Sequence, residues 1–105
     1  MKSEKRIVPM KSARAILVNL DGRILLFKYH DPRQDVIDFW VTPGGGLGKG
    51  ETFEEAVVRK LWEEVGLKDA KLGLCVWHRF NSFRVGEDWY ELEEKYFLMK
   101  TEKSP

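Results

Sequence analysis

The stretch GGLGKGETFEEAVVRKLWEEVGL, residues 45 to 67, predicts a glycine-rich loop that leads directly into an amphipathic helix. Thr52 followed by Glu55 matches a capping box, in which each side chain satisfies a free N–H group at the start of a helix. Gly66 is suited to end the helix in the left-handed conformation. We therefore expect one helix that follows Thr52 and runs to about Val65.

The predicted helix has an apolar side and a charged side, as a helix of 3.6 residues per turn allows. The apolar stripe consists of Val57, Val58, Leu61 and Val65. The charged side carries Arg59, Lys60, Glu63 and Glu64. Carboxylates gathered on one helix face suit Mg²⁺ or Mn²⁺, and the start of a helix favours anionic groups. This pattern predicts a diphosphate–metal site, although residue spacing alone also fits a solvated charged surface.

The remainder of the chain is rich in β-strand patterns. We expect a hairpin from strands 13–20 and 23–30 around Asp21-Gly22, a polar loop at 31–38, a short strand at 39–42, and two long strands at 71–83 and 89–100. Strands on both sides of one helix predict an α+β fold with a mixed sheet. Residues 1–12 read as a basic, partly mobile arm in which Pro9 limits regular structure, so the single domain is expected to span 13–105.

Composition fits one soluble domain. The 105 residues are 43% hydrophobic and 33% charged, with a net charge of +1, which gives no reason to expect nucleic-acid or membrane binding through bulk charge. A single cysteine, Cys75, fits a reducing cytoplasmic setting, and its apolar strand predicts a buried thiol. The N-terminal segment lacks the apolar core of a signal peptide.

At residues 45–67 the sequence resembles the Nudix hydrolase family. The family box is Gly, five residues, Glu, seven residues, Arg-Glu, a hydrophobic residue, any residue, Glu-Glu, any residue, Gly and a hydrophobic residue. The fixed positions here are Gly45, Glu51, Arg59, Lys60, Leu61, Glu63, Glu64, Gly66 and Leu67. All match except Lys60, which stands where the family has Glu.

The resemblance implies an α/β/α sandwich around a mixed sheet and hydrolysis of a pyrophosphate bond in a nucleoside diphosphate derivative, with Mg²⁺ or Mn²⁺. Carried over by position, Glu63, Glu64 and a backbone carbonyl near Gly44 would be metal ligands. Glu51 and Arg59 would hold the loop and helix in register, with Glu64 in the catalytic set. Backbone groups of Gly45 and Gly46 would face the nucleotide-like substrate.

Lys60 is the first departure from the family pattern. An ammonium group cannot bind Mg²⁺, and at neutral pH it has no lone pair for base catalysis. Lying between Glu63 and Glu64 on the helix, it would either pair with them and lower metal affinity and turnover, or point to solvent.

Glu94 could supply a replacement carboxylate from the last strand. By period-two alternation Glu94 shares a face with Tyr90, Leu92, Tyr96 and Leu98, where an acid is costly unless it is paired or bound to metal. Glu91 and Glu93 fall on the other face and are expected to be solvated, although a β-bulge would exchange these assignments.

Length is the second departure, because family domains usually continue to a C-terminal helix. We expect the uncovered sheet face either to be covered by a second subunit, giving a homodimer, or to belong to a fragment of a longer domain. The leading hypothesis is a cytoplasmic pyrophosphohydrolase acting on a nucleotide-like small molecule. The alternative is a catalytically silent Nudix-fold domain that binds a nucleotide or a partner.

Overall fold

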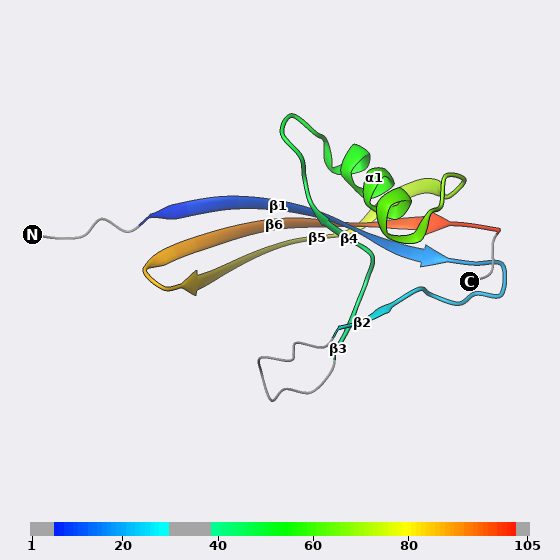
Figure 1. The fold of residues 1–105 in the computed structure, drawn as a ribbon, viewed down its shortest axis with the longest axis horizontal. Coiled ribbons are helices and arrows are strands. Elements are labelled where there is room, and N and C mark those ends of the chain that lie inside the picture. Colours follow the sequence, from blue (N-terminus) through cyan, green and yellow to red (C-terminus); the bar gives the residue numbers. More distant parts are fainter. Residues whose placement is uncertain (1–5, 30–38, 103–105) are drawn as a thin grey trace, which may run out of the picture.

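The computed structural model describes residues 6–29 and 39–102. The elements follow in the order β1 (Ile7–Val18), β2 (Phe27–Tyr29), β3 (Phe39–Val41), β4 (Gly44–Gly46), α1 (Phe53–Val65), β5 (Lys71–Val85) and β6 (Asp88–Lys100). Four strands form a mixed sheet in the order β4-β1-β6-β5, and β2 and β3 pair separately. The fold is therefore α+β with a mixed sheet, as predicted. In Figure 1, α1 lies over one face of this sheet.

Strand β1 organises the sheet, because it pairs with β4 on one side and β6 on the other. Its pairing with β6 is parallel and runs from Ile7↔Trp89 to Val18↔Lys100, whereas its pairing with β4 is antiparallel and short. Strands β5 and β6 form a long antiparallel hairpin. The glycines of β4, which we expected in a loop, thus form a short strand that residues 47–52 connect to α1.

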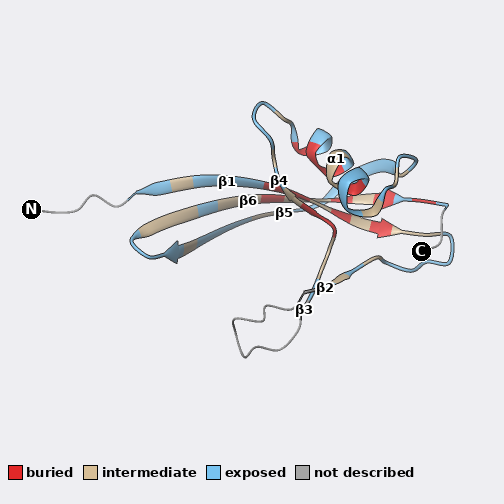
Figure 2. Ribbon diagram, in the orientation of Figure 1, coloured by how far each residue is buried: buried red, intermediate tan, exposed pale blue. Residues whose placement is uncertain are grey.

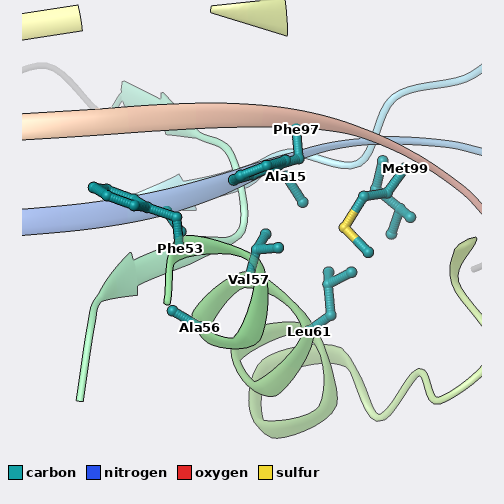
Figure 3. Packing of buried hydrophobic residues seen from close by; sticks show 9 residues of the cluster. Ala15, Phe53, Ala56, Val57, Leu61, Phe97 and Met99 are labelled. Carbon is teal, nitrogen blue, oxygen red and sulfur yellow. The ribbon is translucent and has the colours of Figure 1, made fainter. Parts of the chain in front are cut away.

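The core lies between α1 and the part of the sheet that α1 covers (Figures 2 and 3). It consists of Ala13, Ala15, Leu17, Phe53, Ala56, Val57, Leu61, Phe97 and Met99. Because successive strand residues point to opposite faces, the odd-numbered core positions of β1 and β6 face α1. The even-numbered positions of these strands, including Arg14 and Glu94, therefore face away from the helix.

The N-terminal expectation was partly wrong, because Ile7 to Ser12 form the first half of β1 rather than an irregular arm. Pro9 is tolerated there for a geometric reason. Leu47 donates its N–H to the Lys11 carbonyl, so odd-numbered backbone groups of β1 point toward β4. Strand β4 pairs only with Ser12 to Arg14, which leaves that edge open at Pro9, where no N–H is needed.

The hairpin predicted at 13–20 and 23–30 formed only in part. The turn is present, with the Asn19 side chain accepting hydrogen bonds from the N–H groups of Asp21 and Arg23. Beyond it a single bridge joins Val18 to Ile24, and the chain then leaves β1 so that β2 pairs with β3. The polar loop expected at 31–38 lies outside the described residues.

Two predicted core positions are exposed. Val58 is 45% exposed, because the buried side of α1 is centred on Val57 and Leu61 and Val58 lies beside that side rather than on it. Cys75 is a free, exposed thiol rather than a buried one. It lies in the edge strand β5, where its neighbours Leu74 and Val76 are exposed as well, so the apolar composition of this strand did not mean burial.

Candidate active site

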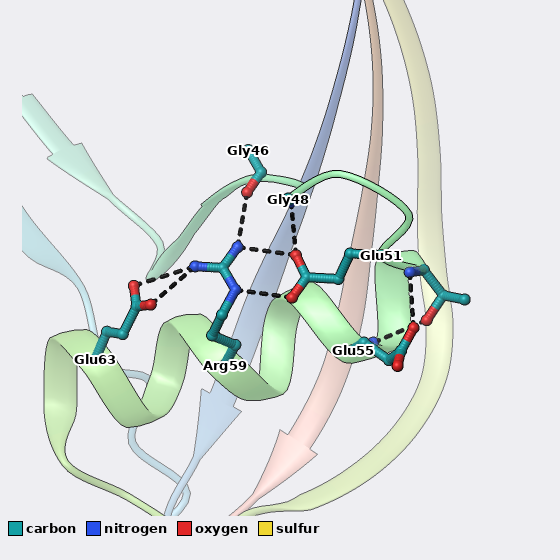
Figure 4. A network of polar contacts seen from close by, with 7 residues as sticks. Gly46, Gly48, Glu51, Glu55, Arg59 and Glu63 are labelled. Carbon is teal, nitrogen blue, oxygen red and sulfur yellow. Dashed lines mark hydrogen bonds and ion pairs between the residues drawn. The ribbon is translucent and has the colours of Figure 1, made fainter.

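The start and end of α1 are set by the local contacts that the sequence predicted. Glu55 donates its backbone N–H to Thr52 Oγ1 at 3.0 Å, and Thr52 donates its own to Glu55 Oε1 at 3.0 Å (Figure 4). Gly66 ends the helix with φ of 75° and donates its N–H to the Trp62 carbonyl. These contacts fix the residues at which α1 begins and ends.

Arg59 joins the helix to the loop in front of it (Figure 4). Its Nε and Nη2 atoms donate to the two carboxylate oxygens of Glu51 at 2.8 and 2.9 Å, and Nη2 also donates to the Gly46 carbonyl at 3.1 Å. Gly48 donates its N–H to Glu51 Oε1 at 2.7 Å. These contacts keep the loop in register with α1.

The ion pair changes the acidity of Glu51. Hydrogen bonds from Arg59, and then from the Gly48 N–H, lower the pKa of Glu51 from 4.5 to about 2. Hydrogen bonding to Glu51, and then to Glu63, raises the pKa of Arg59 above its usual range. Both groups are therefore ionised across the physiological pH range.

The two adjacent carboxylates of α1 have different partners. Glu63 accepts hydrogen bonds from Arg59 Nη1 at 3.0 and 3.2 Å, through its two oxygens. Glu64 Oε1 accepts the backbone N–H of Gly44 at 2.9 Å. Glu64 is thus tied to the glycine strand, and Glu63 belongs to the arginine network.

Lys60 lies against the glycine strand. Its Cε and Nζ atoms are 3.0 and 3.2 Å from the position that a Cβ atom on Gly45 would occupy. Within residues 6–29 and 39–102, Lys60 forms no ion pair with Glu63 or Glu64. The absence of a side chain at Gly45 therefore makes room for the lysine beside the predicted substrate-binding backbone.

Glu94 lies on the sheet face that points away from α1. Its carboxylate is 7% exposed and accepts hydrogen bonds from Arg14 Nε at 3.2 Å and Tyr96 Oη at 3.1 Å. Arg79 Nε is 3.7 Å from Glu94 Oε1. The predicted alternation is confirmed, since Glu94 and Tyr96 share a face. The burial of this acid is compensated by arginine.

The structure thus brings Glu51, Arg59 and Glu63 into one network and Gly44 and Glu64 into another, side by side on α1. Glu94 contacts neither network directly, and its ligation of metal stays a prediction. From the sequence alone, Arg14, Arg33 and Arg79 are three candidate phosphate contacts with no order of preference among them, and the structure distinguishes Arg14. The parallel alignment of β1 with β6, which sets Arg14 opposite Tyr96, is not visible in local sequence patterns. Of the other two, Arg79 contacts Glu94 and Arg33 lies outside the described residues.

The carboxylates can be tested for their fit to a divalent ion. In the described part of the chain, no group of three or more His, Cys, Asp and Glu side chains is arranged to hold one. Mg²⁺ is often bound through only one or two carboxylates, with substrate phosphates and water completing its shell. Glu63 and Glu64 fit such a shared site, in which the substrate supplies ligands.

Aromatic side chains lie on the face away from α1. Trp77 stacks on Tyr96 with ring centres 4.8 Å apart, and the Arg79 guanidinium lies 5.6 Å from the Trp77 ring. On α1 itself, Trp62 is half exposed, with Lys68 Nζ 4.3 Å from its ring centre. Each tryptophan ring therefore already has one face in contact with another side chain.

A glycine strand that leads into a capped carboxylate helix on a mixed sheet defines the class of Nudix domains. The chain belongs to this family, since the family model described as NUDIX domain matches residues 8–104. The chain is similar to the RNA pyrophosphohydrolase of a Nitratiruptor species, with 30% identity over 92% of this chain and 65% of the relative. It is also 35% identical to the RNA pyrophosphohydrolase of Psychrobacter cryohalolentis, over 77% of this chain and 40% of that protein.

Solved structures show the same fold. A MutT protein from Methanosarcina mazei Go1 superposes with a TM-score of 0.66 and 25% identity, covering 92% of this chain and 65% of that one. The E. coli ORF135 protein gives a TM-score of 0.63 at 26% identity, over 87% and 61% of the two chains. The chain therefore spans about two fifths to two thirds of the length of these relatives.

The described residues include no helix of the length and apolarity needed to cross a membrane.

Proposed function

We propose that this chain is a pyrophosphohydrolase domain that cleaves a nucleoside diphosphate derivative with Mg²⁺ or Mn²⁺. The observation that carries the proposal is the contact between Gly44 N–H and Glu64, beside the network of Glu51, Arg59 and Glu63. These contacts set two carboxylates next to a glycine strand whose backbone can approach a diphosphate closely.

Each residue has a proposed role. Glu63 and Glu64 would hold the divalent ion together with phosphate oxygens and the Gly44 carbonyl. The ion would neutralise charge on the phosphates and activate water. Arg59 and Glu51 keep the loop and helix aligned, and Gly44 N–H orients Glu64, which we place in the catalytic set. Backbone groups of Gly45 and Gly46 would face the substrate.

Lys60 weakens this site in our proposal. It lies beside Gly45, where its ammonium repels a divalent ion and attracts phosphate. The chain would therefore hydrolyse slowly, or bind a nucleotide without turnover as a catalytically silent domain. The lysine at a family glutamate position is the observation that favours this second candidate.

The substrate class is open between a free nucleotide and RNA. The net charge of +1 supports a small nucleotide, as the sequence suggested. The names of the similar RNA pyrophosphohydrolases support an RNA whose 5′ end carries a pyrophosphate bond. Both candidates contain the same scissile bond, so one assay can compare them.

The test is turnover by the purified chain with Mg²⁺. A panel of nucleoside diphosphate derivatives and a 5′-triphosphorylated RNA would be incubated with the chain and with Glu64→Gln, prepared identically. We expect slow pyrophosphate-bond cleavage that Glu64→Gln abolishes. Nucleotide binding without turnover would establish the silent domain, and turnover equal in both preparations would reveal a contaminating hydrolase.

We further propose that the chain forms a homodimer. In support, the edge strand β5 exposes Leu74 by 80% and Phe80 by 71%, and an open edge strand with apolar side chains favours association. Light scattering across a range of concentrations would test this, and a monomer at every concentration would contradict it. The cytoplasmic setting inferred from the single cysteine stays a prediction.

A further inference from the structure

Glu94 is a buried acid on the sheet face opposite the predicted active site. Its carboxylate is 7% exposed and holds Arg14 through Nε at 3.2 Å. A buried carboxylate fixes the guanidinium that it contacts, because neither charge can lose its partner without a desolvation cost. Glu94 therefore sets the position of the Arg14 side chain.

Arg14 in turn holds the residues that immediately precede β4. Its Nη1 atom donates to the Thr42 carbonyl at 2.9 Å. Thr42 lies between β3 and β4, so the carbonyl has no strand partner of its own in the pairings of either strand. A second anchor is close by, where Ala15 donates its N–H to the Pro43 carbonyl at 2.8 Å.

The segment held in this way ends at Gly44, which pairs with Arg14 in the β1–β4 register and donates its N–H to Glu64. A continuous series of contacts thus runs from Glu94 through Arg14 and Thr42 to Gly44 and Glu64. It crosses from one face of the sheet to the other.

We propose that Glu94 is a positioning residue that acts through Arg14 to hold residues 42–44 where the Gly44 N–H reaches Glu64. The importance of Glu94 for catalysis rests on the proposed function, whereas the contacts that link Glu94 to Gly44 do not depend on it. This role explains why a carboxylate remains buried in the middle of β6, on the sheet face that points away from α1. It also makes Glu94 a support for the active site rather than a ligand of the metal.

Two matched pairs of variants test the role. Arg14 and Arg79 both contact Glu94, but only Arg14 reaches Thr42, so Arg14→Met is compared with Arg79→Met. Glu94→Gln is compared with Glu93→Gln, which removes the neighbouring acid that contacts His78 on the other face. The readout is the NMR signal of the Gly44 amide in the metal-free chain.

We expect Arg14→Met and Glu94→Gln to move the Gly44 amide proton upfield and to speed its exchange with solvent about tenfold, as for weakening of one charge-assisted hydrogen bond. The two controls should leave this signal in place. The double variant of Arg14 and Glu94 should shift the signal no further than Arg14→Met alone, because both changes break one series of contacts.

An unchanged Gly44 signal in Arg14→Met would overturn the proposal, as would an equal effect of Arg79→Met. Mn²⁺ binding followed by electron paramagnetic resonance provides the second measurement. If Glu94→Gln abolishes Mn²⁺ binding while the Gly44 signal stays in place, Glu94 is a ligand and the positioning role is wrong. Because the amide readout needs neither turnover nor metal, the inference can hold or fail independently of the hydrolase proposal.

Discussion

The side chain of Lys60 lies on Gly45, with its Nζ atom 3.2 Å from the position of a Cβ atom on that glycine. A positive charge thus stands next to the strand that adjoins Glu64, on the helix face where a divalent ion is proposed to bind. The Lys60 ammonium would repel a divalent ion held by Glu63 and Glu64, so the charge at position 60 should control metal affinity.

Lys60→Glu should increase Mn²⁺ affinity roughly tenfold or more, because it replaces a positive charge that repels Mn²⁺ with a carboxylate ligand near Glu64. Turnover with Mg²⁺ should rise with it. Lys60→Met separates the two causes, since it removes the charge without adding a carboxylate. Lys68→Glu makes the same change in charge beside Trp62 and serves as the control. Calorimetric titration and turnover that do not respond to Lys60→Glu would refute the account of an impaired site.

Acid should weaken the contact between Glu51 and Arg59. The pKa of Glu51 is lowered to about 2 by Arg59 and then by Gly48, so its carboxylate is stabilised in the folded chain relative to the unfolded one. The resulting stability is complete above the unfolded pKa near 4.5 and is lost as the pH falls toward 2. Glu51→Gln should therefore lower the urea midpoint at pH 7 and flatten its decline between pH 5 and pH 2.

The matched control for this pH effect is Glu87→Gln, which removes an exposed acid from the turn between β5 and β6. Its urea midpoints should follow those of the unchanged chain. Carbon NMR of the Glu51 carboxyl gives the pKa directly. Titration of that carboxyl near 4.5 would mean that Arg59 does not hold it in solution.

The helix and its caps could be predicted from sequence because their causes are local. Thr52, Glu55 and Gly66 satisfy backbone groups within one or two turns, so the residue pattern contains both partners of each contact. The strand alternation that sets Glu94 beside Tyr96 is equally local. The arginine network around Glu51 followed from the family resemblance, which supplies a spacing already matched to its geometry.

The remaining features depend on partners far away in the chain. Ile7 begins a strand because Trp89 lies beside it, more than eighty residues later, and no local signal marks that parallel pairing. Arg14 acquires its role from the same alignment. Helical periodicity predicted the apolar side of α1 but not which of its residues the sheet buries, so Val58 was placed wrongly. The apolar composition around Cys75 likewise could not show that β5 is an exposed edge strand.

Leu61 should contribute much more to stability than Val58, although both belonged to the predicted apolar stripe. Leu61 is 1% exposed within the core, and its truncation to alanine should cost about 2–5 kcal/mol of unfolding free energy through lost burial and a cavity. Val58→Ala is the matched change on the same helix and should cost less than about 1 kcal/mol. Urea denaturation measures both, and similar losses would mean that Val58 is buried in solution, as in an oligomer.

Gly44 should tolerate no side chain, because β4 approaches β1 too closely there. A Cβ atom at Gly44 would lie 2.2 Å from the Ala13 carbonyl oxygen and 2.7 Å from Arg14 Cα, both backbone atoms that cannot move aside alone. The φ of 140° adds strain for any residue with a Cβ atom. Gly44→Ala should therefore separate β4 from β1, displace the N–H that Glu64 accepts, and destabilise the fold by about 2–4 kcal/mol.

Gly86→Ala is the matched control for Gly44→Ala. Gly86 also has a positive φ, of 63°, but a Cβ atom there would meet no other atom within 4 Å. Its substitution should cost only the left-handed backbone penalty, about 1–2 kcal/mol, and leave Glu64 in place. Urea denaturation gives the two costs, and the carboxyl signal of Glu64 shows whether its hydrogen bond survives. If the two variants lose equal stability and both keep that signal, close packing of β4 on β1 is not what holds Glu64.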